Sequence, residues 1–346
     1  MAKGTVFPGE AYRTFDPETG VEIWQLTSGP TVNTNLYTHV NFFTRDSNTL
    51  IFQSFPGYVR GMTPQIFRVD VDGQNLTQLT DAPGIGGIVL AKETPFVYFL
   101  KKNQLVRENI LTAEEEVVAR EDAVLEAETA LGSLSEDDSF YAADVKWTSG
   151  GFGIFTADLR SGRTRLLKMD AVTHHVQINP ADKNTLLFQY FNDDPHMLWL
   201  MDSNGQNLRP LNVLRETGHF TWMGKTGRVL TTADYPRKAL VSIADGEAAE
   251  QVIVESPEIY FWHAGVSRDG QWIVSDSNWP DQGIFLIHAE TGTVRKLCSD
   301  YSSKTYQLSH PHPAFSPDGK QVVFNSDRYG FPHVFLAKIP EEWQKI

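Results

Sequence analysis

The chain has 346 residues, of which 41% are hydrophobic and 12% aromatic, so it can bury a large core. Its formal net charge is −13 and its basic residues are not clustered, which argues against nucleic acid and anionic membranes as partners. No apolar run approaches the roughly 18–20 residues needed to cross a bilayer. The first ten residues lack the apolar segment of a secretory signal, and the single cysteine, Cys298, cannot form an intrachain disulfide. These features predict a cytoplasmic protein.

A turn signal built around an aspartate recurs along the chain. The copies are Thr44–Ser47, Ser135–Asp138, Asn179–Asp182, Ser267–Gly270 and Ser316–Gly319. Each copy is followed by a β-type run, and then by a second run, a turn and a third run. Short strands joined by polar turns at a period of about 44 residues are typical of four-stranded propeller blades.

We therefore predict an all-β fold, a seven-bladed β-propeller that forms a single domain over residues 1–346. The blades are predicted to start near residues 37, 85, 129, 174, 217, 259 and 304. The second blade lacks the aspartate turn, and the fifth has 223–227 in its place. The acidic segment Glu114–Arg120 is interpreted as the outer strand of the second blade, with a helix as the alternative. Two separate β-domains are the alternative architecture, but no linker composition supports them.

The last repeat ends at Pro340, one strand short of a blade. Residues 8–28 contain a turn followed by a strand pattern that has no inner half. We predict that this N-terminal strand completes the last blade and closes the ring, because closure removes the free sheet edges.

Five blades place a histidine six or seven residues before the turn aspartate, or at the equivalent position. These are His39, His175, His219, His263 and His312. The innermost strand of a blade lines the central channel, so these side chains should form a ring. His39 and His175 are candidate substrate-binding residues, with satisfied structural histidines as the alternative. The remaining histidines, His174, His196, His288 and His333, are expected on the solvent side.

The segment from Gln307 to His312 contains three side chains with neutral lone pairs. In an extended strand His310 and His312 point the same way, whereas Gln307 could join them only from the preceding loop. With His263 from the adjacent blade, this set suits a borderline divalent metal better than calcium. Because all four ligands are neutral, a bound ion would keep its charge and attract a carboxylate- or phosphate-bearing substrate.

The sequence lacks a nucleophile elbow, a phosphate-binding loop and a zincin motif. What remains is a Lewis acid beside one further histidine, His219. A metal on the carboxylate of a uronic acid would stabilise the enolate-like state, and a neutral imidazole could take the α-proton. Loss of the O4 substituent would then complete a β-elimination. The alternatives for His219 are a metal ligand or a simple lining residue.

Three stretches, together with the opening segment Phe15–Gly20, resemble the oligogalacturonate lyases, which are seven-bladed propellers with TolB-like repeats. The stretches are Gly218–Met223, His263–Asp276 and Gln307–Gly319. The resemblance implies that His263, Gln307, His310 and His312 hold a divalent metal, which is manganese in that family. It also implies that His219 is the general base and that the substrate is a short oligogalacturonide, an anionic oligosaccharide.

The chain departs from the family in the fourth blade. The family has a longer loop there, with an arginine that contacts the substrate, whereas residues 191–199 are short and acidic without an arginine. Arg60, Arg237 and His196 are the candidates to replace that charge, and Arg237 comes first because it lies in the blade of His219. The competing hypothesis is a non-catalytic TolB-like binding propeller with a metal or ligand in its funnel.

Overall fold

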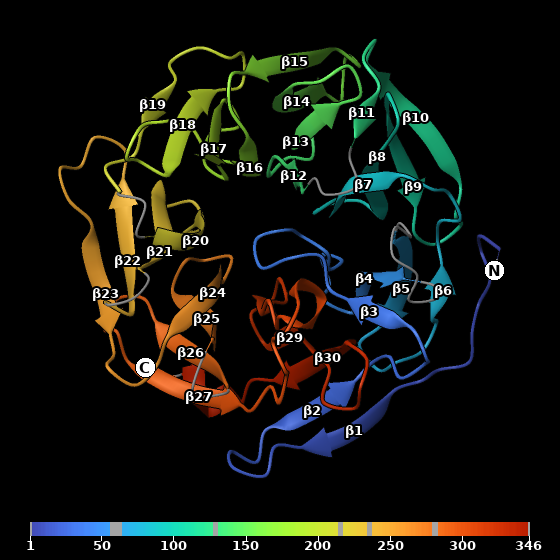
Figure 1. Cartoon of the computed structure of the whole chain (residues 1–346). Coiled ribbons are helices and arrows are strands. Elements are labelled where there is room, and N and C mark those ends of the chain that lie inside the picture. The colour runs from blue at the N-terminus through green and yellow to red at the C-terminus, as the bar shows by residue number, and fades with distance from the viewer. Residues whose placement is uncertain are drawn as a thin grey trace.

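The computed structural model describes residues 2–55, 64–126, 131–213, 217–233, 237–278 and 283–344. Within these residues the strands form seven antiparallel sheets arranged as a ring around one axis (Figure 1). The predicted all-β, seven-bladed propeller is therefore confirmed. Arg60 lies outside the described residues. None of the described helices is long and apolar enough to span a membrane.

Six of the sheets follow the chain in order from the channel outward, except that β11 and β12 of the third sheet both pair with β13. Their strands are β3 (Val32–Thr34), β4 (Thr49–Phe55), β5 (Gln65–Asp70) and β6 (Thr77–Gln78); β7 (Ile85–Leu90), β8 (Phe96–Lys101), β9 (Gln104–Asn109) and β10 (Glu115–Arg120); β11 (Leu125–Glu126), β12 (Gly132–Leu134), β13 (Phe140–Trp147), β14 (Phe152–Asp158) and β15 (Thr164–Met169); β16 (Thr173–Ile178), β17 (Thr185–Tyr190), β18 (Leu198–Asp202) and β19 (Arg209–Pro210); β20 (Thr217–Trp222), β21 (Arg228–Ala233), β22 (Ala239–Ala244) and β23 (Gln251–Glu255); and β24 (Phe261–Val266), β25 (Trp272–Ser277), β26 (Ile284–His288) and β27 (Val294–Cys298).

The seventh sheet joins the two ends of the chain. It contains β28 (Ala314–Phe315), β29 (Gln321–Ser326) and β30 (His333–Lys338), followed outward by β2 (Glu22–Gln25) and β1 (Tyr12–Phe15). Strand β2 pairs antiparallel with β30, with Ile23 opposite Ala337. In Figure 1 the blue N-terminal strands accordingly lie beside the red C-terminal ones. The ring is thus closed by backbone hydrogen bonds between segments about 300 residues apart.

Four of the five copies of the recurring turn signal share a physical basis. In Ser267–Gly270 the hydroxyl of Ser267 donates to the Asp269 carboxylate at 2.6 Å, and the N–H of Gly270 donates to the Ser267 carbonyl at 2.8 Å. The same hydroxyl–carboxylate bond is 2.7 Å at Thr44–Asp46 and 2.6 Å at Ser135–Asp137 and Ser316–Asp318. The repeat therefore encodes one self-capped turn between the first and second strands of a blade.

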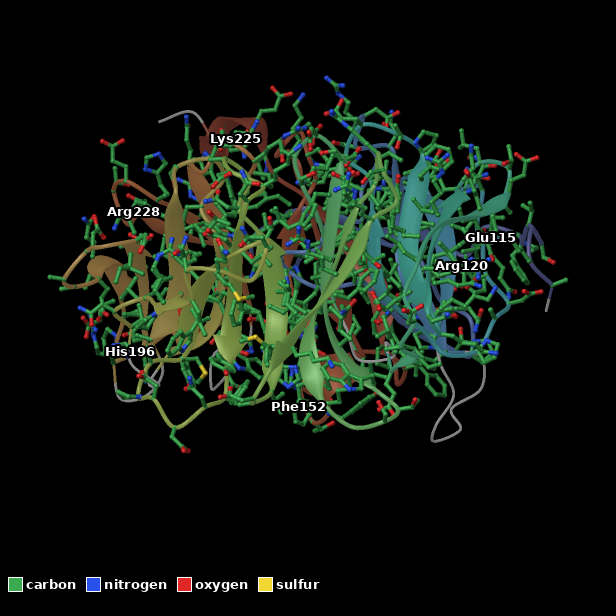
Figure 2. The ribbon with its side chains drawn as sticks, turned by 90° about the horizontal axis from the view of Figure 1, so that it is seen from above. Glu115, Arg120, Phe152, His196, Lys225 and Arg228 are labelled. Atoms are coloured by element: carbon green, nitrogen blue, oxygen red, sulfur yellow. The ribbon has the colours of Figure 1, made fainter. Side chains whose placement is uncertain are left out.

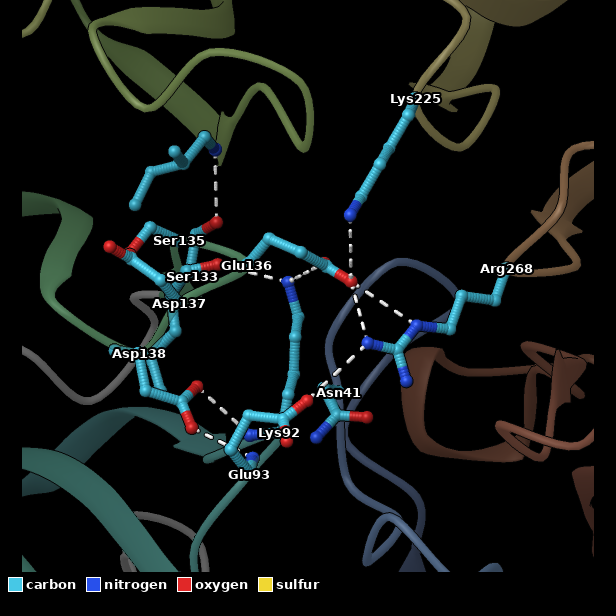
Figure 3. A network of polar contacts seen from close by, with 12 residues as sticks. Asn41, Lys92, Glu93, Ser133, Ser135, Glu136, Asp137, Asp138, Lys225 and Arg268 are labelled. Carbon is cyan, nitrogen blue, oxygen red and sulfur yellow. Dashed lines mark hydrogen bonds and ion pairs between the residues drawn. The ribbon is translucent and has the colours of Figure 1, made fainter.

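The second blade lacks this turn, and its neighbour supplies the missing carboxylate. Asp138 accepts the backbone N–H groups of Lys92 and Glu93 at 2.9 and 2.8 Å (Figure 3). Burial raises the pKa of Asp138, while these two hydrogen bonds favour its charged form. The segment Glu115–Arg120 is a strand paired with β9, as predicted.

Cys298 and His333 are both buried. Cys298 is fully buried. The expectation that His333 lies on the solvent side is wrong, because it is 4% exposed and contacts the Thr27 hydroxyl at 3.2 Å. His333 lies in β30, opposite Ser326, and is therefore inside the closed seventh sheet.

The turns between first and second strands carry an ion network across one mouth of the channel. Glu136 accepts two bonds from Arg268 at 2.7 and 3.2 Å and one from Lys92 at 2.9 Å, and Lys225 approaches it to 3.8 Å (Figure 3). These residues come from the third, sixth, second and fifth blades. Lys225 lies at the opposite face of the ring from Phe152 and His196 (Figure 2). Glu136 therefore ties blades together across the channel.

Replacing Asp138 should destabilise the ring at the second blade. Asp138→Ala removes the acceptor for two backbone N–H groups and places alanine at a φ of 50°. We expect a loss of about 1–3 kcal/mol in the free energy of unfolding, measured by urea denaturation. Asp138→Asn should lose less, because it keeps one acceptor and tolerates this φ. Asp81→Ala, at an exposed position, controls for loss of charge. An Asp138→Ala variant as stable as that control would contradict this role.

Candidate metal centre

The innermost strands of three blades carry a β-bulge at the level of the histidines. Two residues drop out of the strand ladder in each case: His175–Val176 in β16, Gly218–His219 in β20 and Trp262–His263 in β24. A bulge leaves the extra residue unpaired and re-aims its side chain. The ring centroids of His219 and His263, from adjacent blades, consequently lie 4.2 Å apart. The predicted ring of channel histidines therefore depends on bulges that spacing alone does not reveal.

Three of the four predicted metal ligands converge. His263, His310 and His312 each offer a ring nitrogen, and these atoms all lie within 4.8 Å of one another. Each residue also has a buried ring nitrogen without a hydrogen-bond partner in the described part of the chain: Nε2 of His263, Nδ1 of His310 and Nε2 of His312. Buried unpartnered nitrogens are costly. Three neutral imidazoles at this separation fit a borderline divalent cation.

Asp276 orients His263 from β25. Its carboxylate accepts the His263 backbone N–H at 2.7 Å and contacts Nδ1 at 2.8 Å. The carboxylate therefore fixes the proton on Nδ1 and leaves the Nε2 lone pair free for a ligand, as in carboxylate–histidine–metal arrangements. Burial raises the pKa of Asp276 to about 6. Asp276 is the last residue of the His263–Asp276 stretch, and the sequence analysis gave it no role.

The expectation that His310 and His312 share the face of an extended strand is wrong. Residues Gln307–Ser309 form a 3-10 turn, η1, and β28 begins only at Ala314. His310 is extended, with φ −69° and ψ 136°, whereas His312 has a φ of 45°. The two rings converge through the different backbone conformations of His310 and His312 and not through strand parity.

This loop is held by two asparagines. Asn325 donates its amide to the His310 carbonyl at 3.1 Å, and Asn35 donates to the His312 carbonyl at 2.7 Å. The two amides also bond to each other at 3.0 Å. Asn35 follows β3 and Asn325 lies in β29, so the loop is fixed between the first and seventh blades. This support stabilises the uncommon φ of His312.

Gln307, the fourth predicted ligand, is the first residue of η1 and its side chain is exposed. Its carbonyl accepts the N–H of His310 at 3.2 Å. Ligation by its side chain stays a prediction.

His219, the predicted base, lies beside the three histidines but outside their group. Its Nδ1 is 3.0 Å from the Trp262 carbonyl, so Nδ1 carries the proton and Nε2 carries the lone pair. Burial lowers the pKa of His219 to about 4. The imidazole is therefore neutral at pH 7, which is the state that a general base requires.

Tyr37 occupies the middle of the histidine ring, and sequence reasoning did not single it out. Its ring centroid lies 4.6 Å from His312, 4.9 Å from His175 and 5.0 Å from His39. His39 and His175 thus lie across Tyr37 from the metal centre, in the same channel. Burial lowers the pKa of His39 to about 3, so this side chain is neutral. Substrate binding by His39 and His175 stays a prediction.

Of the candidate replacement charges, Arg237 and His196 are described by the structure, and each already has an acidic partner. Arg237 forms an ion pair with Glu250, near β23 on the outer side of the same blade. His196 has its Nδ1 2.6 Å from Asp194. Among the described residues, a cation that sequence reasoning missed is Lys304, which is 5% exposed and bonded to Asp300 at 3.1 Å and to the Ser277 carbonyl at 2.6 Å. Its charge favours the ionised form of Asp276.

Comparison with known proteins gives one consistent result. The chain is 24% identical to an oligogalacturonide lyase of Pectobacterium atrosepticum, over 99% of both chains, and 24% identical to an oligogalacturonate lyase of Dickeya dadantii, over 99% of this chain and 100% of the relative. No family model matches. The chain resembles the oligogalacturonate lyases along its whole length. The resemblance predicted from three short stretches is thereby confirmed.

Solved structures of the oligogalacturonate lyases share the fold. One, in complex with manganese, superposes with a TM-score of 0.84 at 22% identity, and one from Vibrio parahaemolyticus with 0.84 at 19%. Both matches cover 99% of this chain and 100% of the other.

Substitution of Asp276 should weaken metal binding without loss of the ring. In Asp276→Asn the amide cannot hold the proton on His263 Nδ1 in the same way, and Asp276→Ala removes the contact. We expect both variants to bind Mn²⁺ about 10–100-fold more weakly in calorimetric titration. His288→Ala, at the partly buried last residue of β26, is the control and should bind normally. Unchanged affinity in the Asp276 variants would contradict the role of Asp276 in orienting His263 for the metal.

Proposed function

We propose that this protein is a metal-dependent lyase that cleaves short uronic-acid oligosaccharides by β-elimination. The observation that carries the proposal is the pairing of two features in one channel. Three histidines present converging, buried lone pairs. A fourth, His219, is neutral and has its tautomer fixed beside them. The similarity to oligogalacturonate lyases supports an oligogalacturonide as the substrate.

The metal would be held by His263, His310 and His312, with Gln307 as the predicted fourth ligand. The donor chemistry fits Mn²⁺ or a similar divalent ion, and manganese is the ion named for the structural relative. When bound, the ion would act as a Lewis acid on the substrate carboxylate and offset the charge that develops on proton loss. Asp276 contributes by holding His263 in one tautomer and orientation.

His219 would take the proton from C5 of the uronide, next to the carboxylate. The C5–H electron pair forms the C4=C5 double bond, and the C4–O4 bond breaks with its electrons leaving on O4. The hydrogen bond from Nδ1 to the Trp262 carbonyl keeps Nε2 available and becomes stronger when the imidazole gains a proton. Contacts of Arg237, Arg60, His175 and His39 with the substrate remain predictions from the sequence.

The function is tested with metal-loaded protein and a panel of uronides. Elimination creates a conjugated double bond, so ultraviolet absorbance should rise on mixing with digalacturonate and Mn²⁺. If protein shown to contain metal gives no absorbance change with any uronide, the lyase proposal is wrong and a binding propeller takes its place.

Two substitutions separate the roles of the histidines. His310→Ala should lose both the metal and the activity, because it removes a converging ligand. His219→Ala should keep the metal and lose activity by about 10²–10⁴-fold, the usual contribution of a general base. Metal content and initial rates are measured on the same samples, with His288→Ala as the control. If His219→Ala also loses the metal, the base assignment is wrong.

A further inference from the structure

We propose that the indole of Trp262 is the platform on which the substrate's sugar ring packs, so that this side chain orients the uronide for proton removal. The inference rests on the proposed function, because it names a substrate-positioning residue at the same site. It adds a contact to the apolar face of the sugar, whereas the metal and His219 account for the carboxylate and the C5 proton.

Trp262 lies next to both halves of the chemistry. Its ring centroid is 4.1 Å from His263 and 4.2 Å from His310, which are two candidate metal ligands, and 6.1 Å from His219. A uronide carries its carboxylate on C5, the atom that loses the proton. A sugar bound at the metal and facing His219 therefore has its ring within reach of the indole.

The bulge in β24 explains how two consecutive rings reach one site. In a regular strand Trp262 and His263 would point to opposite faces of the sheet. Both residues drop out of the ladder between Phe261 and Ala264, and both rings approach His310, at 4.2 and 5.4 Å. Trp262 also stands seven residues before Asp269, the register at which the first and fourth blades carry His39 and His175. The sixth blade thus places an aromatic ring where those blades place a channel histidine.

Trp262 differs from its neighbours along the chain in its solvent exposure. Phe261 is fully buried and His263 is 1% exposed, whereas Trp262 remains partly exposed. A partly exposed aromatic side chain beside convergent polar groups is typical of a ligand pocket. The C–H face of a sugar ring is apolar, and an indole offers a flat apolar surface with a polarised ring system for it.

The backbone and side chain of Trp262 have separable tasks. Its carbonyl fixes the tautomer of His219, and that group survives any side-chain substitution. Variants of Trp262 therefore test the indole without removing the support of the base. The competing role for the indole is a packing wall that fixes His310, in which case its loss would weaken metal binding.

The test compares Trp262→Phe, which keeps a smaller aromatic face, with Trp262→Leu, which keeps only apolar bulk. We expect Trp262→Leu to raise KM for digalacturonate about tenfold and Trp262→Phe to raise it less. The affinity for Mn²⁺ should stay within about twofold of the parent in both variants. Trp272→Leu, a partly exposed tryptophan that packs on His288 instead, is the matched control and should leave KM unchanged.

A binding measurement keeps this inference distinct from the lyase proposal. Metal-loaded His219→Ala protein is titrated with digalacturonate while its tryptophan fluorescence is recorded. The fluorescence change should disappear in the double variant that also carries Trp262→Phe. A Trp262-dependent change without elimination by the parent protein would overturn the lyase proposal and retain the platform. If Trp262→Leu still catalyses elimination with an unchanged KM, and the fluorescence change on binding persists in this variant, the platform is overturned and the lyase proposal is retained. Loss of Mn²⁺ in both Trp262→Leu and Trp262→Phe would show a packing wall and also overturn it.

Discussion

The pairing of β2 with β30 is the constraint on which the metal centre depends. It joins the N-terminal strands to the seventh sheet, and the first blade begins directly afterwards at Val32. The loop that carries His310 and His312 is held from both sides of this junction, by Asn35 and by Asn325. The pairing of the two chain ends places the first blade beside the seventh, where these two amides bond to each other and support the φ of His312. Ring closure therefore positions the ligands as well as protecting the sheet edges.

The electrostatics of the centre differ in one respect from what the ligand types suggest. The three converging histidines are neutral, so a bound divalent ion would have no charged direct ligand among them. Directly behind His263, however, lies the fully buried carboxylate of Asp276. Lys304 offsets part of this charge while it is itself paired with Asp300. The ion would thus keep less than its full effective charge toward a substrate, in return for a fixed ligand geometry.

The fold could be predicted because the recurring turn sequences reveal the length of one blade. In four blades a hydroxyl, an aspartate and a residue with positive φ recur in chain order, and they mark the turn before the second strand. The channel histidines followed from the same register. The backbone geometry that brings His310 and His312 together could not be predicted, because it depends on a 3-10 turn and on the positive φ of His312 instead of strand parity. Trp262 and Tyr37 were missed for a similar reason: a bulge and an interrupted inner strand place them, and neither has a sequence signature.

The indole of Trp262 can account for the absence of an arginine from the acidic fourth blade. An arginine that clamps a carboxylate supplies charge and two directed hydrogen bonds, but it orients only the end of the sugar that it holds. Here Arg237 is already paired with Glu250, and His196 contacts Asp194. A site that binds the carboxylate at a metal and supports the ring on Trp262 gains orientation from an apolar face, which net negative charge does not weaken. Such a site would select for the shape of the uronide ring at C5 more than for the number of its charges, and this distinguishes it from one built on cationic contacts.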